Sequence, residues 1–325
     1  MADYKHIIWK ISKIAGLVLA GLLAVLLLLA IIPVNISDLS SNPDPAASYE
    51  DSIKRIQSVI AEETGKVCDI CGTRLLTHGE PTDKVVVLVH GLTNSPRQFQ
   101  ELGEMLYNDG YNVLIPRMPY HGLKTHTVSE LENTTTEGLR LFSDEIVDMA
   151  AGLGDEITVA GLSGGGTVVA WIAQNRSDVN RVVLIAPLFG LAQVPQFAST
   201  MLGNLFSRIP EITWASSSEV PRESVYLGWS TRGVAEYLVF SRAAQPVAEG
   251  EPSQVKNIVL VTNGNDHTVN NGMSEVIVQK WETAGATVTR YQFDESLGLP
   301  HDYIDVSAIG DKSQWIYPIL IGLIE

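Results

Sequence analysis

The chain has 325 residues, a formal net charge of −15 and only two cysteines. This length allows one large domain or two smaller ones, and 45% hydrophobic with 18% charged residues excludes a disordered chain. The acidic balance, without any cluster of lysine and arginine, argues against a nucleic-acid partner. The composition therefore predicts a globular protein with an added apolar segment.

Residues 14–32, IAGLVLAGLLAVLLLLAII, form an uncharged run near the N-terminus. At about 1.5 Å rise per residue, a helix of this length nearly spans a hydrocarbon core of about 30 Å. A signal peptide has a shorter apolar stretch, about 7–15 residues, and a small-residue cleavage site soon after it, whereas Pro33 follows here. We predict an uncleaved transmembrane anchor, with a cleaved signal peptide and a buried core helix as the alternatives.

The charges on the two sides of this run differ in sign. Lys5, Lys10 and Lys13 precede it. Acidic residues follow it, namely Asp38, Asp44, Glu50 and Asp51. Because positively charged flanks stay in the cytoplasm, we expect residues 1–13 to be cytoplasmic and the bulk of the chain to lie outside the cytoplasm, at the cell membrane.

The sequence after the anchor divides into a linker and a domain. Residues 33–65 are expected to be a linker and lead-in segment, and residues 66–325 the main domain. The polar, proline-containing part of the linker, residues 37–48, is expected to hold that domain off the bilayer.

Cys68 and Cys71 stand in the short motif CDICG. Their spacing is that of half a zinc site, but the sequence supplies no second half. A thioredoxin-like pair opens a helix inside a βαβ unit, and this pair precedes strand-like sequence instead. We predict a structural role, open to a small disulfide loop in an oxidising compartment, and no metal site.

From residue 84 onward, strand-like and helix-like segments alternate. Strands are predicted at residues 84–90, 111–117, 156–161, 180–187, 256–266 and 287–295. Helices are predicted at residues 95–110, 129–151, 167–174 and 269–285. The β-branched run of the first strand is typical of a strand buried on both faces of a parallel sheet. The order predicts an α/β fold, with a mostly parallel central sheet and helices on both faces.

A long interruption at residues 188–255 separates two of these strands. It is rich in large apolar side chains and is too long for an ordinary connection, so it is interpreted as an inserted cap, with a separate helical domain as the alternative. An acyl pocket needs an apolar lining, and six cap residues are candidates for it, namely Phe189, Phe197, Met201, Phe206, Trp214 and Trp229.

The pattern Gly161-x-Ser163-x-Gly165 lies between a predicted strand and a predicted helix. In that setting it is typical of a nucleophile elbow, a tight turn at which glycines let strand and helix approach and the serine hydroxyl projects from the sheet. Ser163 is therefore the candidate nucleophile.

A serine nucleophile needs a base, and in this architecture the acid and then the histidine follow the serine along the chain. Only His267 and His301 follow Ser163. His267 adjoins Asp266, and neighbouring side chains on an extended chain point apart. We predict His301 as the base and Asp266 as its acid.

The rival acids are Asp294, Glu295 and Asp302. Asp294 and Glu295 are expected to be surface charges near the last strand. Asp302 adjoins His301 and meets the same geometric objection as the Asp266–His267 pair.

An oxyanion hole requires two N–H donors. The amide of Gly164, directly after the serine, and that of Leu92, in the loop after the first long strand, are the candidates. His90 precedes the serine along the chain, so it is expected to brace this loop rather than to act as a base.

Four stretches together resemble the α/β-hydrolase superfamily: VLVHGLTNSPRQFQELGEMLYNDGYNVLIPRMPYHG, GLSGGG, NGNDHTV and LPHDY. The nearest likeness is to bacterial carboxylesterases and monoacylglycerol lipases, including the Ser-aminopeptidase-like hydrolases. The resemblance implies an α/β-hydrolase fold and hydrolysis of short to medium acyl esters or monoacylglycerol-like lipids through an acyl-serine, with no cofactor and no metal. An amide or peptide hydrolase with the same triad, and a non-catalytic membrane-tethered binding protein, are the alternatives.

Overall fold

A seven-stranded sheet lies at the centre of the computed structural model, which describes residues 2–192, 194–215, 224–246 and 250–325. The strands are β1 (Arg74–Leu76), β2 (Thr82–Val89), β3 (Asn112–Ile115), β4 (Gly154–Leu162), β5 (Arg181–Ile185), β8 (Asn257–Asn263) and β9 (Thr287–Phe293). They are ordered β1-β3-β2-β4-β5-β8-β9, and all neighbouring pairs are parallel except β1 with β3. The prediction of a mostly parallel sheet is confirmed.

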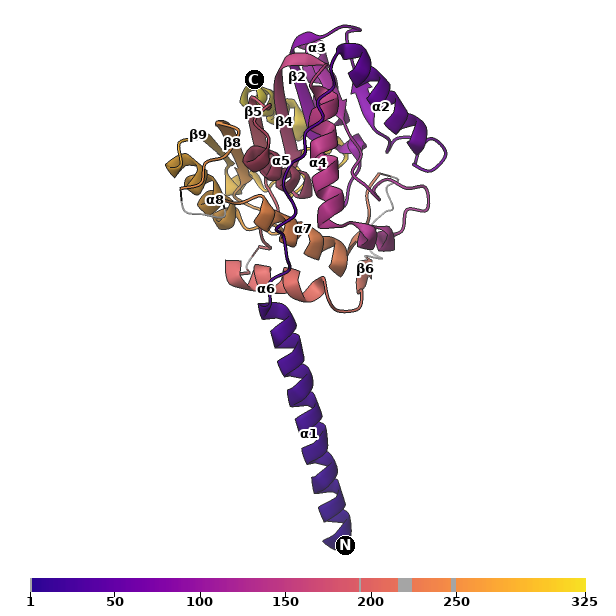
Figure 1. The fold of residues 1–325 in the computed structure, drawn as a ribbon, viewed down its shortest axis with the longest axis vertical. Helices are drawn as coiled ribbons and strands as arrows, with labels where there is room; N and C mark the ends of the chain where they lie inside the picture. The colour runs from indigo at the N-terminus through magenta and orange to yellow at the C-terminus, as the bar shows by residue number, and fades with distance from the viewer. Residues whose placement is uncertain (1, 193, 216–223, 247–249) are drawn as a thin grey trace.

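The central strands are buried because helices cover both faces of the sheet. The five residues from Val85 to Val89 in β2 are fully buried, as the continuous apolar run predicts. One face carries α4 (Thr136–Ala150), α5 (Gly164–Asn175) and α8 (Asn271–Thr283), of which α4 and α5 lie in front of the strands in Figure 1. The other face carries α3 (Gln100–Asn108) and α10 (Ser313–Ile324), which contact each other. Short helices complete the connections, namely η1 (Pro96–Phe99), η2 (Val128–Asn133), η3 (Glu295–Leu297), α9 (Val306–Ile309) and η4 (Gly310–Lys312).

Two helix boundaries differ from the predictions. The helix predicted over 129–151 is broken into η2 and α4, because the Thr135 side chain accepts a hydrogen bond from the Gly138 amide and caps a new helix there. The helix predicted over 167–174 begins earlier, at Gly164, directly after Ser163.

The residues before the first predicted strand contain two elements that the sequence patterns did not reveal. Helix α2 (Tyr49–Glu63) begins after Ser48, whose side chain accepts a hydrogen bond from the Asp51 amide. Strand β1 adds an antiparallel edge beside β3. Between them, Cys68 and Cys71 form a disulfide that packs with Val67 and Leu123. The described residues contain no group of three His, Cys, Asp or Glu placed to hold a metal ion.

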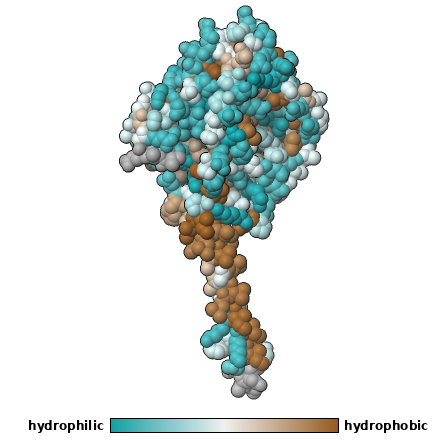
Figure 2. All heavy atoms as spheres, in the orientation of Figure 1, coloured by the Kyte–Doolittle hydropathy of each residue, from teal (hydrophilic) through white to brown (hydrophobic). Residues whose placement is uncertain are grey.

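Most of the N-terminal helix α1 (Ala2–Ile31) extends away from the rest of the chain, and only its C-terminal end contacts the domain (Figure 1). Its segment His6–Ile31 is long and apolar enough to cross a membrane, by length and composition. Figure 2 shows this segment as a nearly continuous apolar stalk.

Residues 33–48, which we call the N-terminal strap, lie against the domain. The Trp171 indole donates to the Leu39 carbonyl oxygen at 3.0 Å. The Asn42 amide donates to the Asp144 carboxylate at 3.0 Å, and the Ala46 amide donates to the Asp148 carbonyl oxygen at 2.9 Å. Residues 37–48 are therefore docked on the domain and do not form a free spacer; their expected position relative to the bilayer stays a prediction. The polar composition of these residues reflects hydrogen bonds to buried groups of α4 and α5 rather than freedom in solvent.

The cap, residues 188–255, contains α6 (Gln196–Phe206), β6 (Thr213–Ala215), β7 (Gly228–Ser230) and α7 (Thr231–Ala243). Residues 193, 216–223 and 247–249 of the predicted insertion lie outside the described residues. Strands β6 and β7 pair in antiparallel fashion, and α6 packs on α7. In Figure 1, α6 and α7 lie between the sheet and α1.

Candidate active site

Ser163 occupies a strained turn between β4 and α5. Its φ of 56° and ψ of −114° are rare for a residue with a side chain. Three backbone hydrogen bonds hold it there: its amide donates to Ile185, and its carbonyl oxygen accepts from Thr167 and Leu188, all at 2.9–3.0 Å. The strain is therefore fixed by the surrounding fold and not by a local preference of serine.

The glycines around Ser163 are required by close approach. A Cβ on Gly161 would lie 2.6 Å from the carbonyl carbon of Gly165, and a Cβ on Gly165 would lie 2.2 Å from the Val89 carbonyl oxygen. Both distances are much shorter than a van der Waals contact. The helix can therefore start immediately after the serine only because neither position carries a side chain.

His301 and Asp266 form a hydrogen-bonded pair beside this turn. The His301 Nδ1 and the Asp266 Oδ2 are 2.7 Å apart, although 35 residues separate them. Burial raises the pKa of the Asp266 carboxyl, but hydrogen bonds from His301 and from the amides of Thr268 and Val269 outweigh it, so the pKa is lowered on balance. An ionised Asp266 accepts a hydrogen bond from the Nδ1–H group of His301 and so favours the tautomer in which Nε2 carries no proton. Nε2 is buried and has no hydrogen-bond partner among the described residues.

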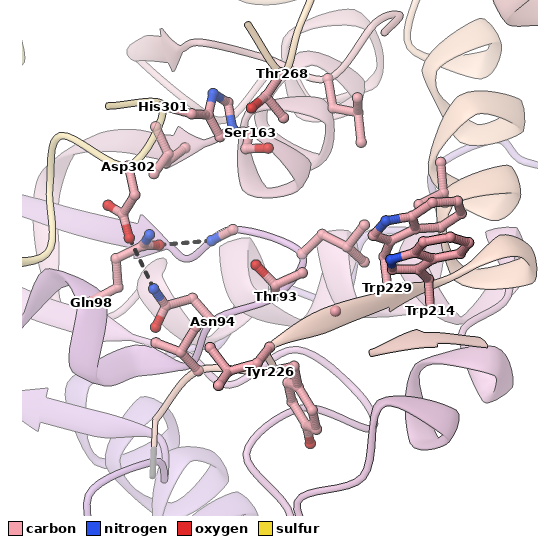
Figure 3. A pocket seen from close by; sticks show the side chains of 18 of the residues that line it. Thr93, Asn94, Gln98, Ser163, Trp214, Tyr226, Trp229, Thr268, His301 and Asp302 are labelled. Atoms are coloured by element: carbon pink, nitrogen blue, oxygen red, sulfur yellow. Dashed lines mark hydrogen bonds between the residues drawn. The ribbon is translucent and has the colours of Figure 1, made fainter. Parts of the chain in front are cut away.

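Figure 3 places the His301 and Ser163 side chains next to each other at one side of a pocket. The rival residues lie elsewhere. His267 is exposed, and Asp294 caps η3 at the surface. Asp302 accepts a hydrogen bond from the Asn94 side chain at 3.1 Å. The structure places the Ser163 side chain beside the hydrogen-bonded His301–Asp266 pair, which are the three side chains that the sequence singled out.

Leu92 and Gly164, the two candidate oxyanion donors, lie close together. A Cβ on Gly164 would lie 3.2 Å from the Leu92 nitrogen, so the two residues are in contact. Gly164 is the first residue of α5, and the first amides of a helix have no intrahelical acceptor. Within the described chain neither amide donates to another protein group. They are placed as two free donors beside the serine.

The loop that carries Leu92 is braced by buried side chains. The Gly91 amide donates to the Gln98 side chain at 2.8 Å, and the Leu92 carbonyl oxygen lies 2.6 Å from His121 Nε2. His121 Nδ1 lies 2.8 Å from the Pro119 carbonyl oxygen. Burial lowers the pKa of His121 to about 4, against the effect of these carbonyl oxygens, so the ring is neutral near pH 7 and donates to one of the two.

His90 also contacts the loop that carries Leu92. Its Nδ1 lies 2.9 Å from the Gly91 carbonyl oxygen, and its Nε2 accepts from the Met118 amide at 3.1 Å. Burial, and then the neighbouring His121, lower the pKa of His90 well below its ordinary value. A neutral, fully hydrogen-bonded ring suits the bracing position predicted for it.

A pocket of about 690 Å³ opens in front of Ser163 and His301. One side is polar and carries Thr93, Asn94, Gln98 and Asp302 (Figure 3). Partial burial raises the pKa of Asp302, against hydrogen bonds from the Asp305 amide and the Gln98 side chain. Trp214 and Trp229 lie on the other side (Figure 3). The apolar residues of the lining also include Leu188, Leu191, Phe206, Val225, Leu227 and Val234.

Only three of the six cap residues expected to line an acyl pocket do so, namely Phe206, Trp214 and Trp229. Phe189 is buried in the main core, and Phe197 is 69% exposed on the surface of α6. Met201 is half-buried and is not part of the pocket wall. Hydrophobicity alone does not separate a core position, a pocket wall and a surface helix face. The polar wall formed by Asn94, Gln98 and Asp302 was not predicted, because no local motif marks it.

The chain has the α/β-hydrolase fold: a parallel sheet with a serine turn after β4 and a histidine–aspartate pair in the loops after β9 and β8. In sequence it is similar to esterases and lipases that share this fold. The model of the family "Serine aminopeptidase, S33" matches residues 80–232.

Known relatives point in the same direction. A thermostable monoacylglycerol lipase of Bacillus sp. (strain H-257) is 29% identical over 202 residues, which cover 60% of this chain and 75% of the relative. A metagenome-derived lipolytic enzyme superposes with a TM-score of 0.57 at 19% identity, covering 80% of this chain and 99% of the other. The monoacylglycerol lipase of Paleococcus ferrophilus gives a TM-score of 0.55 at 18% identity, covering 78% and 97%. At these identities the two structures establish the shared fold.

Proposed function

We propose that this protein is a membrane-anchored serine hydrolase that cleaves carboxylic esters through an acyl-serine intermediate. The observation that carries the proposal is the placement of Ser163, on a strained turn, beside the His301–Asp266 pair and two free amides. The monoacylglycerol lipase relative supports the choice of an ester as substrate. No step of the proposed reaction requires a cofactor.

The proposed reaction begins when Ser163 Oγ attacks the ester carbonyl carbon while His301 Nε2 takes the hydroxyl proton. Asp266 holds the His301 tautomer and stabilises the imidazolium that forms. The carbonyl oxygen, now negatively charged, accepts from the Leu92 and Gly164 amides, and one such donor contributes about 2.7–4 kcal/mol in comparable enzymes.

The tetrahedral intermediate collapses when the bond to the alcohol oxygen breaks and His301 returns the proton to that oxygen. The acyl group stays on Ser163. A water molecule then gives a proton to His301 and attacks the acyl carbon, and collapse releases the carboxylic acid and regenerates the serine. His301 Nε2 has no competing partner among the described residues, which suits both proton transfers.

The two sides of the pocket fit the two parts of an ester. We assign the acyl chain to the apolar side, next to Trp214 and Trp229, and the alcohol to the polar side, next to Asn94 and Asp302. Each buried methylene contributes about 0.8 kcal/mol. The proposed substrates are therefore short to medium acyl esters, including monoacylglycerol-like lipids.

We also propose that α1 anchors the protein in the cell membrane. In this proposal residues 1–13 are cytoplasmic, residues 14–32 span the bilayer, and residues 66–325, with the cap at 188–255, form an extracytoplasmic hydrolase domain. The lysines before the run and the apolar surface of α1 support this arrangement. Alkaline carbonate should fail to extract the full-length protein from membranes. Its release into the supernatant would contradict the anchor.

The activity is tested with p-nitrophenyl esters of graded acyl length, using Ser163→Ala as the control. We expect turnover by the wild type that Ser163→Ala lacks, together with fluorophosphonate labelling of the wild type only. Equal turnover by the two proteins would contradict the assignment of the nucleophile. Faster cleavage of alanine p-nitroanilide than of any ester would favour an amide hydrolase, and absence of both labelling and turnover would favour a binding protein.

A further inference from the structure

The C-terminal end of α1 is hydrogen-bonded to the cap helix α6. The Asn204 side chain donates to the Ala30 carbonyl oxygen at 2.9 Å, and Arg208 donates to the Leu29 carbonyl oxygen at 2.8 Å and to that of Pro33 at 3.0 Å. The last carbonyl groups of a helix have no intrahelical donor and carry partial negative charge. Asn204 and Arg208 therefore cap α1 from another part of the chain.

Arg242 of α7 completes this contact. Its guanidinium donates to the Val34 carbonyl oxygen at 3.3 Å and to the Asn204 side-chain oxygen at 3.2 Å. Asn204 is 2% exposed, so the Asn204 part of the contact is buried, whereas the Arg208 bond to Pro33 is exposed. Neither Arg208 nor Arg242 forms an ion pair with a described carboxylate. We call Asn204, Arg208 and Arg242 the clamp. Both arginines of the clamp donate hydrogen bonds to backbone carbonyl oxygens at or just after the end of α1.

The clamp fixes the cap at the point where α1 ends. Figure 1 shows α6 lying across the end of α1, with β6 at the same end of the domain. Figure 2 shows apolar surface continuing from the stalk onto this end of the domain. If α1 crosses a bilayer, the cap must lie at the headgroup region of the leaflet in which α1 ends.

Large apolar side chains are exposed on the cap. Phe197 in α6 is 69% exposed, Ile212 before β6 is 54% exposed, and Trp214 in β6 is 64% exposed. Trp229 in β7 is the direct cross-strand partner of Trp214 and is also exposed. Tryptophan is enriched at membrane interfaces, where an apolar ring carries a polar N–H. We call these four residues the cap face.

The cap face adjoins the pocket mouth. Trp214 and Trp229 belong both to the exposed cap face and to the apolar wall of the pocket, where they lie together in Figure 3. A molecule that moves from the surface at Trp214 toward Ser163 therefore stays in contact with apolar side chains. The alcohol end of the pocket lies on the opposite, polar side.

We propose that the cap face rests on the lipid surface and that the pocket takes single-chain ester lipids directly from the leaflet in which α1 ends, with the clamp holding the pocket mouth against that leaflet. The proposal rests on the anchored ester hydrolase proposed above and adds the route by which its substrate arrives. The partner surface is the bilayer itself, because the clamp leaves the cap no other position relative to the membrane exit of α1.

The position of the cap face is tested with a nitroxide attached to Phe197→Cys in the full-length protein in phosphatidylcholine–phosphatidylglycerol vesicles. The label is specific because the two native cysteines are joined in a disulfide. Glu80→Cys, at an exposed site just before the N-terminal end of β2, is the matched control, because Ser163 and His301 follow the opposite, C-terminal ends of the parallel strands. We expect position 197 to collide with oxygen and to be shielded from a polar relaxation agent, and position 80 to show the reverse. Equal accessibility to the polar agent at both positions would overturn the proposal.

The route of the substrate is tested with the variant Arg208→Ala/Arg242→Ala, compared with Arg290→Ala, an arginine on β9 outside the cap. Two rates are measured in the same vesicles: hydrolysis of monooleoylglycerol in the bilayer and of water-soluble p-nitrophenyl acetate. We expect the clamp variant to lose at least fivefold on monooleoylglycerol while keeping the acetate rate within twofold, and Arg290→Ala to change neither. An unchanged ratio of the two rates in the clamp variant would overturn the proposal.

These outcomes separate this proposal from the proposed function. If wild-type protein cleaves neither ester, the hydrolase assignment fails. If it cleaves both but position 197 lies in water, the hydrolase stands and only delivery from the bilayer is refuted. Should the clamp variant not fold, the nitroxide measurement still decides, because Phe197 is a surface position.

Discussion

Ser163, whose side chain we propose as the nucleophile, has an unfavourable backbone conformation. The three backbone hydrogen bonds that hold it also hold the Gly164 amide in place, since that amide is the next group along the chain. Strain at such a turn costs about 1–3 kcal/mol and persists only when the surrounding fold determines it. The stability of β4 and α5 is therefore linked directly to the geometry that we propose for the reaction.

Replacements of the two histidines that follow Ser163 along the chain should have very different effects on turnover. His301→Ala removes the side chain that we propose as the base, and we expect turnover of p-nitrophenyl butyrate to fall at least a thousandfold. His267→Ala removes an exposed ring and should change turnover less than twofold. The steady-state kcat of the two purified variants is the measurement. Comparable losses in both would refute the assignment of the base.

The buried histidines below the oxyanion loop predict a pH dependence of stability. The pKa of folded His121 is about 4, below its ordinary value of 6.5, so the unfolded chain binds this proton first as the pH falls. The neutral His121 ring therefore makes its full contribution to the free energy of unfolding above about pH 6.5. This contribution is lost between pH 6.5 and about 4, at up to about 1.4 kcal/mol per pH unit for one proton. His90, whose pKa is also lowered, adds to the same trend.

His121→Asn isolates the contribution of one ring. The amide of asparagine can still donate to the Leu92 carbonyl oxygen, but it does not titrate. The difference in free energy of unfolding between wild type and variant, measured by urea denaturation at pH 7, 6 and 5, should shift in favour of the variant as the pH falls. A difference that stays constant over this range would show that His121 is not buried in its neutral form.

Sequence patterns identified the three proposed reacting side chains because each sits at a position set by the order of strands. The residues that shape the polar pocket wall have no such marker. Asn94 and Asp302 are 208 residues apart, and their contact depends on how two loops meet above the sheet. A long-range contact of this kind leaves no periodic signal in one sequence.

Helices α4 and α5 are joined by a buried ionic cluster that also holds the N-terminal strap. The Arg176 guanidinium is fully buried and binds Asp144 at 3.1 Å, Asp148 at 2.7 Å and Asp178 at 2.6 Å. The Asp144 and Asp148 carboxylates also accept hydrogen bonds from backbone amides of the strap. The strap is thus attached through the same carboxylates that neutralise the arginine.

Arg176→Ala should destabilise the protein by about 3–5 kcal/mol, because it leaves buried carboxylates without their cation. Arg290→Ala is the matched control, since Arg290 also binds two carboxylates, Glu275 and Glu282, but at the surface. Surface ion pairs contribute about 0–1 kcal/mol. Urea unfolding of both variants is the measurement, and equal destabilisation would show that the cluster has no special role.

The cap should set the preference for acyl length. Replacing Phe206 and Trp229 by alanine widens the apolar side of the pocket and removes its contacts with the acyl chain. We expect kcat/KM of the wild type to rise with acyl length, at about 0.8 kcal/mol for each buried methylene, until the pocket is full. The double variant should flatten this profile more than it lowers the rate on acetate. A profile of unchanged shape would assign the preference to the loops near Leu92.

Over the whole molecule, hydrophobic periodicity was sufficient to predict the parallel sheet and most of its helices. It missed the edge strand β1 and the helices α2 and α10, and it misjudged the N-terminal strap as a spacer. Helix α10 is apolar, so its composition does not explain why it was missed. Strand β1 is short and the strap is polar, and the strap is held by contacts with distant elements, such as Asn42 with Asp144. The docking of α1 on the cap was missed for the same reason, because Asn204 and Ala30 are 174 residues apart.

The central claim is that ester hydrolysis passes through a covalent acyl group on Ser163. It is tested most directly by mass spectrometry of the protein quenched in acid during turnover of p-nitrophenyl butyrate. We predict a butyryl adduct on the peptide that contains Ser163, present in the wild type and missing in Ser163→Ala. An adduct on another residue, or hydrolysis by Ser163→Ala at the wild-type rate, would contradict this account.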